Sequence, residues 1–68
     1  MTLEEFANAM ENDEELIIKY KDEKLGRMVN VADDQRDQFI RNHGNLEVTR
    51  IAAGSFRVIV TIYNPFCN

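Results

Sequence analysis

The fold is decided by residues 46–63, which read LEVTRIAAGSFRVIVTIY. Polar and apolar residues alternate over residues 46–51, and the small residues at 52–55 favour a turn. Residues 56–63 then predict a second strand, whose apolar face carries Phe56, Val58, Val60 and Ile62. Because its opposite face is only half polar, we expect this strand to be central in its sheet.

A helix is predicted just before this hairpin, over residues 33–44. Acidic residues crowd its start, and Arg41 and His43 lie in its last turn, as the helix dipole favours. Gly44 follows, and we expect it to adopt a positive φ that ends the helix. The apolar stripe is thin, so this helix should cover a core with one narrow face. The apolar stripe consists of Ala32, Phe39 and Ile40.

The first residues predict another helix, at about residues 3–12. Thr2 and Glu5 have the spacing of a capping box, in which each side chain bonds the other's backbone amide. An apolar stripe with helical spacing follows. It is made of Leu3, Phe6, Ala7 and Met10.

Residues 16–24 are open to two interpretations. Residues 16–21 alternate and are rich in strand-forming types, and residues 27–31 predict the returning strand of a hairpin with a loop of about five residues. In the alternative, the first helix continues through Lys24 and ends near Gly26, which leaves a two- or three-stranded sheet. The alternation favours the hairpin.

The predicted order is therefore α-β-β-α-β-β. We expect an α+β fold of two layers, with two helices packed on a small antiparallel sheet. A chain of 68 residues has room for a single domain, which we place at residues 1–68. A domain this short has a small margin of stability, so association with another chain is a natural source of more.

Composition excludes several classes of protein. The chain is 44% hydrophobic and 29% charged, as folded proteins are, and has no apolar run long enough to span a membrane. Its single cysteine, Cys67, and single histidine, His43, cannot supply a disulfide framework or a four-ligand zinc site. The start of the chain is acidic, where a secretion signal would be basic. We expect a cytoplasmic protein without a cofactor.

Catalysis is not expected. His43 is placed to interact with the end of a helix, and nothing in the sequence places Cys67 beside it to form a nucleophile pair. Motifs for phosphate loops, calcium loops and zinc proteases are absent from the sequence.

Charge placement suggests how the protein acts. The net charge is −4, and half of the twelve acidic residues fall in the first fifteen positions, where there is no Lys or Arg. We expect this segment to attract a basic surface of a larger protein. The residues expected to supply this attraction are Glu11, Asp13, Glu14 and Glu15. The residues expected to supply buried apolar contact are Ile59, Tyr63 and Phe66.

The sequence thus predicts a small non-catalytic interaction module, a regulator or inhibitor of the style that phage and mobile elements encode. One alternative is a homo-oligomer that pairs through the edge or face of the C-terminal strand. Another is a weak binder of single-stranded nucleic acid, through a sheet face that carries Arg50, Arg57 and Tyr63. The acidic net charge disfavours nucleic acid.

Overall fold

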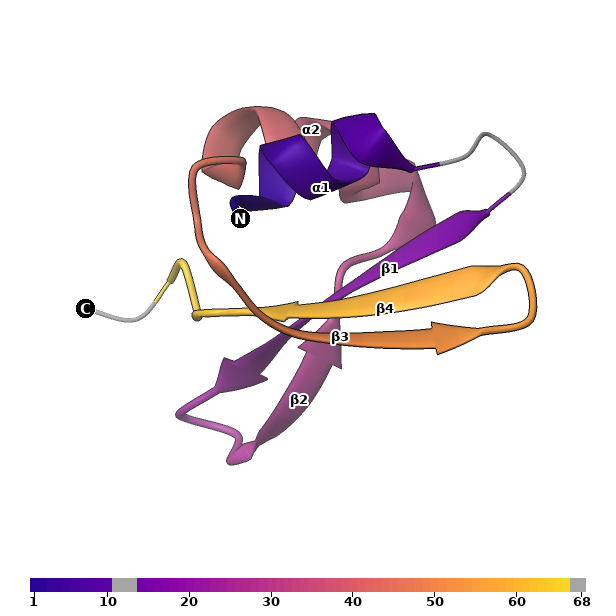
Figure 1. Ribbon diagram of the computed structural model, residues 1–68. Coiled ribbons are helices and arrows are strands. Elements are labelled where there is room, and N and C mark those ends of the chain that lie inside the picture. The colour runs from indigo at the N-terminus through magenta and orange to yellow at the C-terminus, as the bar shows by residue number, and fades with distance from the viewer. Residues whose placement is uncertain (11–13, 67–68) are drawn as a thin grey trace.

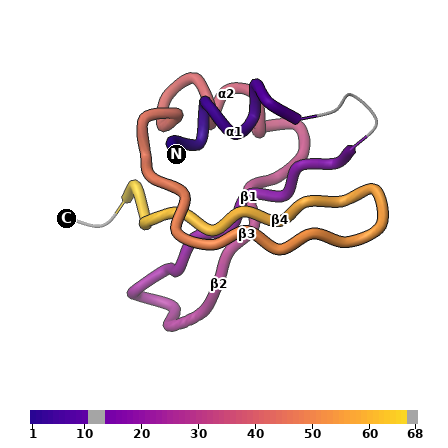
Figure 2. Tube along the Cα trace, viewed as in Figure 1, coloured from indigo at the N-terminus to yellow at the C-terminus, as the bar shows by residue number. Residues whose placement is uncertain are grey.

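The computed structural model describes residues 1–10 and 14–66, which form a layer of helices on one face of a four-stranded sheet (Figure 1; Figure 2). This confirms the α+β class and the order α-β-β-α-β-β. The elements are α1 (Leu3–Ala9), β1 (Glu15–Asp22), β2 (Arg27–Asn30), the 3-10 turn η1 (Asp33–Gln35), α2 (Arg36–His43), β3 (Val48–Gly54) and β4 (Arg57–Ile62).

The first hairpin has the predicted form. β1 and β2 pair antiparallel, so the alternative of a helix through Lys24 is wrong. The carboxylate of Asp22 accepts bonds from the amides of Lys24 and Leu25 and so closes the loop. Gly26 completes the turn with a φ of 66°, which glycine adopts without steric cost.

The sheet is mixed, whereas the sequence predicted a fully antiparallel one. Its strand order is β2-β1-β4-β3, and β1 pairs with β4 in parallel. In this register three consecutive apolar residues of β1, residues 16–18, lie opposite three of β4, residues 58–60, with Leu16 opposite Val58 and Ile18 opposite Val60. Such runs are typical of central strands. As predicted, β4 is central, so it has no free edge, and the expectation of edge pairing through this strand is wrong.

The second hairpin turns later than expected. β3 continues through Gly54, and the turn is Ser55 and Phe56 alone, because Gly54 pairs with Arg57. Phe56 has a φ of 58° and is 75% exposed. It is therefore a turn residue and does not belong to the apolar face of β4, where the alternation had placed it.

The core lies between the helices and the two central strands. Leu16 and Ile18 of β1 and Val60 of β4 meet Leu3 of α1 and Phe39 of α2. The helix stripe predicted from spacing is confirmed, since Phe6, Ala7 and Met10 pack against this core. The helix itself ends earlier than the predicted residue 12, because the backbone at Met10 is already extended.

The two helices touch at their ends. The backbone amides of Leu3 and Glu4 donate to the carbonyls of Leu46 and Gly44, at 2.9 Å each. These bonds satisfy amides of the first turn of α1 that have no partner within the helix. Gly44 has a φ of −64°, so the predicted positive φ is wrong. A glycine fits here because a Cβ would lie 3.0 Å from the Cβ of Glu4 and 2.5 Å from the carbonyl oxygen of Ile40.

The capping box at the start of α1 is confirmed and should make stability depend on pH. The Thr2 amide donates to Glu5 Oε1 at 2.9 Å, and the Glu5 amide donates to Thr2 Oγ1. The bond from the Thr2 backbone lowers the pKa of Glu5, and the bond from the Thr2 hydroxyl adds to this effect. This contribution to stability is thus complete above the ordinary pKa of 4.5 and is lost as the pH falls through the lower folded-state pKa.

Glu5→Gln should remove this dependence, since a glutamine oxygen accepts the same bond without titrating. Thermal unfolding, followed by circular dichroism from about pH 6 to about pH 3, should show a smaller loss of Tm in the variant than in the parent protein. Because the other carboxyls titrate in both proteins, the difference isolates Glu5. Parallel curves would contradict this assignment.

Candidate functional site

One face of the sheet has no helix or strand of the described residues packed on it, and we call it the open face. Side chains alternate along a strand, so the register fixes which residues it carries. Lys19 of β1, Thr61 of β4 and Arg50 of β3 lie opposite one another in one row. The next row is apolar and consists of Ile17, Ile59 and Ala52.

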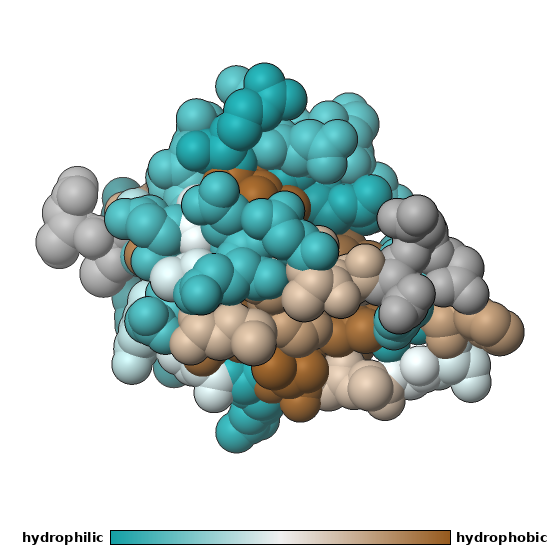
Figure 3. Space-filling model, turned by 45° about the horizontal axis from the view of Figure 1, so that its top comes forward, coloured by the Kyte–Doolittle hydropathy of each residue, from teal (hydrophilic) through white to brown (hydrophobic). Residues whose placement is uncertain are grey.

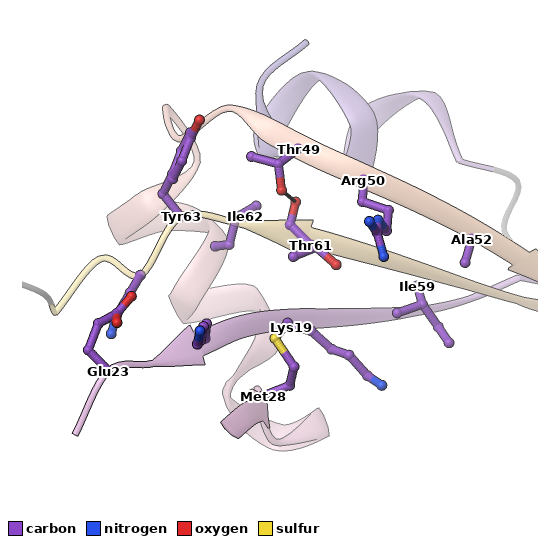
Figure 4. A pocket seen from close by; sticks show the side chains of 12 residues that line it. Lys19, Glu23, Met28, Thr49, Arg50, Ala52, Ile59, Thr61, Ile62 and Tyr63 are labelled. Carbon is purple, nitrogen blue, oxygen red and sulfur yellow. Dashed lines mark hydrogen bonds between the residues drawn. The ribbon is translucent and has the colours of Figure 1, made fainter. Parts of the chain in front are cut away.

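The basic row, with Ile59 and Ala52 of the apolar row, lines a shallow concavity of about 710 Å³ (Figure 4). Ile59 of the lining is half-buried, and Tyr63, which is 67% exposed, lies beyond the end of β4. The hydroxyl of Thr49 donates to the carbonyl oxygen of Thr61 at 3.1 Å and joins β3 to β4 beside the basic row. The structure therefore brings two of the three predicted apolar site residues, Ile59 and Tyr63, into one concave surface.

The charged residues that line the concavity are mainly basic. Lys19, Lys21 and Arg50 line it, against one acidic residue of the lining, Glu23. Arg57, on the same face, lies 3.9 Å from the carboxylate of Glu15, and both side chains are exposed. A surface ion pair of this kind contributes little to stability. The open face thus has a positive charge in a protein whose net charge is negative.

Phe66 lies elsewhere. Its ring packs edge-on against Tyr20, with 5.6 Å between ring centroids, and contacts Phe39 and His43 of α2. These contacts are on the helix side of the sheet, because Tyr20 shares the face of the core residues of β1. His43 is part of this aromatic cluster, 4.9 Å from Phe39 between centroids. Phe66 is still 59% exposed, but it does not extend the surface that contains Ile59 and Tyr63.

The predicted acidic site is only partly within the described residues. Glu11 and Asp13 lie outside them. Glu14 precedes β1 and lines a small depression between the helix layer and the sheet, together with Met10 and Arg36. Glu15 has Arg57 as its neighbour, so its charge is partly compensated. Hydrophilic side chains cover much of the surface over the helices (Figure 3). The attraction of this segment for a basic partner stays a prediction.

No group of three metal-ligating side chains occurs within residues 1–10 and 14–66. Cys67 lies outside these ranges, so its placement relative to His43 is not described. Among the described residues, no helix has both the length and the apolar character that crossing a membrane requires.

Sequence reasoning missed Lys19, Lys21 and Met28 as parts of the site. Lys19 and Lys21 were visible as the polar positions of an alternating strand. What was missing was the neighbour of that strand, because Arg50 and Ile59 join these lysines only when β1 lies beside β4. The parallel pairing of the two hairpins therefore assembles the surface.

No protein-family model, curated protein or solved structure matches this chain.

Proposed function

We propose that this chain is a cytoplasmic, non-catalytic protein-interaction module that regulates or inhibits a larger protein by covering part of its surface. The observation that carries this proposal is the open face, where an apolar row lies beside a basic row. Apolar residues in the centre of a surface with polar residues around them are typical of protein interfaces.

The charge of the open face defines the partner. Lys19 and Arg50 are two strands apart, about 10 Å between backbones, with Thr61 between them. They match acidic groups that flank an apolar contact, and the attraction speeds association. The partner region that meets the open face is thus acidic, while the N-terminal acids of this chain would attract a basic region of the same partner.

Single-stranded nucleic acid fits this face less well. Stacking platforms present several aromatic rings, and among the described residues that line the concavity Tyr63 is the one aromatic. Aliphatic residues such as Ile17 and Ile59 bury well against protein but offer no stacking. The net charge of −4 would also repel a phosphate backbone at a distance.

The test uses a defined acidic probe, a peptide that alternates glutamate and leucine. In an NMR titration at low ionic strength, we expect shifts at Lys19, Ile59 and Thr61, and the binding should weaken as salt is added. Replacing Lys19 and Arg50 with glutamate should reduce the affinity at least about tenfold, because attraction becomes repulsion. Lys19 is half-buried and Arg50 is exposed, so far-UV circular dichroism must show that the variant is folded.

Two controls distinguish binding that depends on charge from non-specific hydrophobic binding. A lysine–leucine peptide of the same length should cause no shifts on the open face. Leu25→Glu changes the charge of an exposed residue in the β1–β2 loop and should leave the affinity nearly unchanged. Tighter binding of an oligothymidine strand than of the acidic peptide would assign the face to nucleic acid. An absence of shifts on β1 and β4 would overturn the proposal.

A further inference from the structure

β3 is an outer strand, and beyond Val48, whose amide donates to the carbonyl oxygen of Met1, its free edge has little protection. Residues 49–54 are all exposed, and the strand has one charged residue, Arg50, and no proline. Natural proteins usually shorten such edges or place charges on them, because unpaired backbone groups accept another strand. The other edge of the same sheet is shorter, since β2 has four residues and begins at Arg27. β3 therefore offers another strand a longer edge than β2 does.

The side chains along β3 are also apolar where solvent reaches them. Ile51 pairs with the core residue Val60 and lies on the helix side of the sheet, yet it is 51% exposed. Ala53 follows on the same side, opposite Val58. The space-filling view shows hydrophobic side chains at the surface below the helix layer (Figure 3). The helices cover β1 and β4, and Val48 at the start of β3 packs against the core, whereas the rest of this outer strand is exposed.

Phe56 adds a strained residue to this hairpin. Its φ of 58° is uncommon for an aromatic residue, and its ring is 75% exposed. Strained positions persist where they have a use, because the conformation itself costs free energy. Here the strain places a large apolar ring at the tip of the hairpin, next to the end of the exposed edge.

We propose that β3 pairs antiparallel with β3 of a second copy of this chain, about a two-fold axis through Ala52. A register irregularity between Val48 and Arg50 leaves residues 50–54 as the regular part of the edge, and Ala52 is its centre. In this register Ile51 lies opposite Ala53 of the second copy, a large side chain against a small one. Arg50 lies opposite Gly54, so like charges do not meet. The product is one continuous eight-stranded sheet.

The second copy suits this edge for two physical reasons. A two-fold axis makes each strand both donor and acceptor, so the unpaired backbone groups of both edges are satisfied at once. The strand is nearly uncharged, so it lacks the charges that keep identical edges apart. A small domain without disulfides also gains stability from association.

The test is sedimentation equilibrium over a range of concentrations, with a reductant present to exclude disulfides through Cys67. The mass should rise with concentration from 7.9 kDa toward twice that value. Ala52→Lys and Ala52→Glu should each abolish this rise, because each puts two like charges opposite one another at the axis. An equimolar mixture of the two variants should restore it, because lysine then faces glutamate.

Leu25→Lys is the matched control, an exposed apolar residue changed to a charge far from β3, and it should associate like the parent protein. Far-UV circular dichroism confirms that the Ala52 variants are folded, as their exposed position predicts. A constant mass of 7.9 kDa at every concentration would overturn the proposal. So would association that survives both Ala52 substitutions, or a mixture of the two variants that stays monomeric.

Discussion

Replacing Ile18 with alanine is expected to unfold a large fraction of the protein at room temperature. Ile18 is 1% exposed and lies at the centre of the core, opposite Val60 in the parallel pair of strands. Truncating a buried isoleucine costs about 2–5 kcal/mol, since the contacts are lost and a cavity remains. A domain of this size has a stability of only about 3–5 kcal/mol. Urea unfolding followed by far-UV circular dichroism measures the loss.

Ile17→Ala is the matched control for this experiment. Ile17 is the neighbouring residue of the same type, but it lies half-buried on the open face, opposite Ile59. Its truncation removes part of a cross-strand contact, which costs about 1 kcal/mol or less. Equal losses in the two variants would show that both faces of the sheet are covered, which contradicts the two-layer arrangement.

Gly44→Ala is expected to have the second largest effect, a loss of about 1–3 kcal/mol. The added Cβ would lie 2.5 Å from the carbonyl oxygen of Ile40, and the helix end must shift to admit it. The shift also disturbs the bond from the Glu4 amide to the Gly44 carbonyl, which joins α1 to α2. Thermal unfolding should show a Tm lower by about 4–8 °C for each kcal/mol lost.

Gly54→Ala tests whether the effect belongs to the close approach or to glycine in general. A Cβ at Gly54 would be 3.9 Å from the nearest atom, an ordinary contact. Replacing a glycine in an accessible conformation stabilises a protein by about 0.4–1 kcal/mol, because the unfolded chain loses freedom. A Tm that falls equally in both variants would contradict the steric account of Gly44.

Local patterns predicted each element of this fold. The Thr2–Glu5 spacing, the alternation of β1 and the pattern of residues 33–44 all depend on neighbours within a few residues, and such signals are present in the sequence. The last pattern predicted one helix, whereas the structure has the 3-10 turn η1 followed by α2, and Ala32 of the predicted stripe is exposed. The turn of the second hairpin was predicted too early because Phe56 occupies a position where glycine or asparagine is usual. No pattern in the neighbouring residues predicts the positive φ of Phe56.

The pairing of the two hairpins could not be predicted from patterns of neighbouring residues. Local patterns indicate which strands pair across a short turn, but β1 and β4 meet with half of the chain between them. Their shared signal was a continuous apolar triplet in each, since strands buried in the middle of a sheet are apolar on both sides. Because the open face is built across this junction, its basic row was predicted only in part, through Arg50.

The parallel pairing of β1 with β4 also has a consequence for the order of events during synthesis. The hairpin of β1 and β2 leaves the ribosome early, yet the inner edge of β1 has no partner strand until residues 57–62 have been made. Two-stranded hairpins are marginally stable alone. The nascent chain must therefore stay largely unstructured, and cooperative folding begins only when β4 has been made.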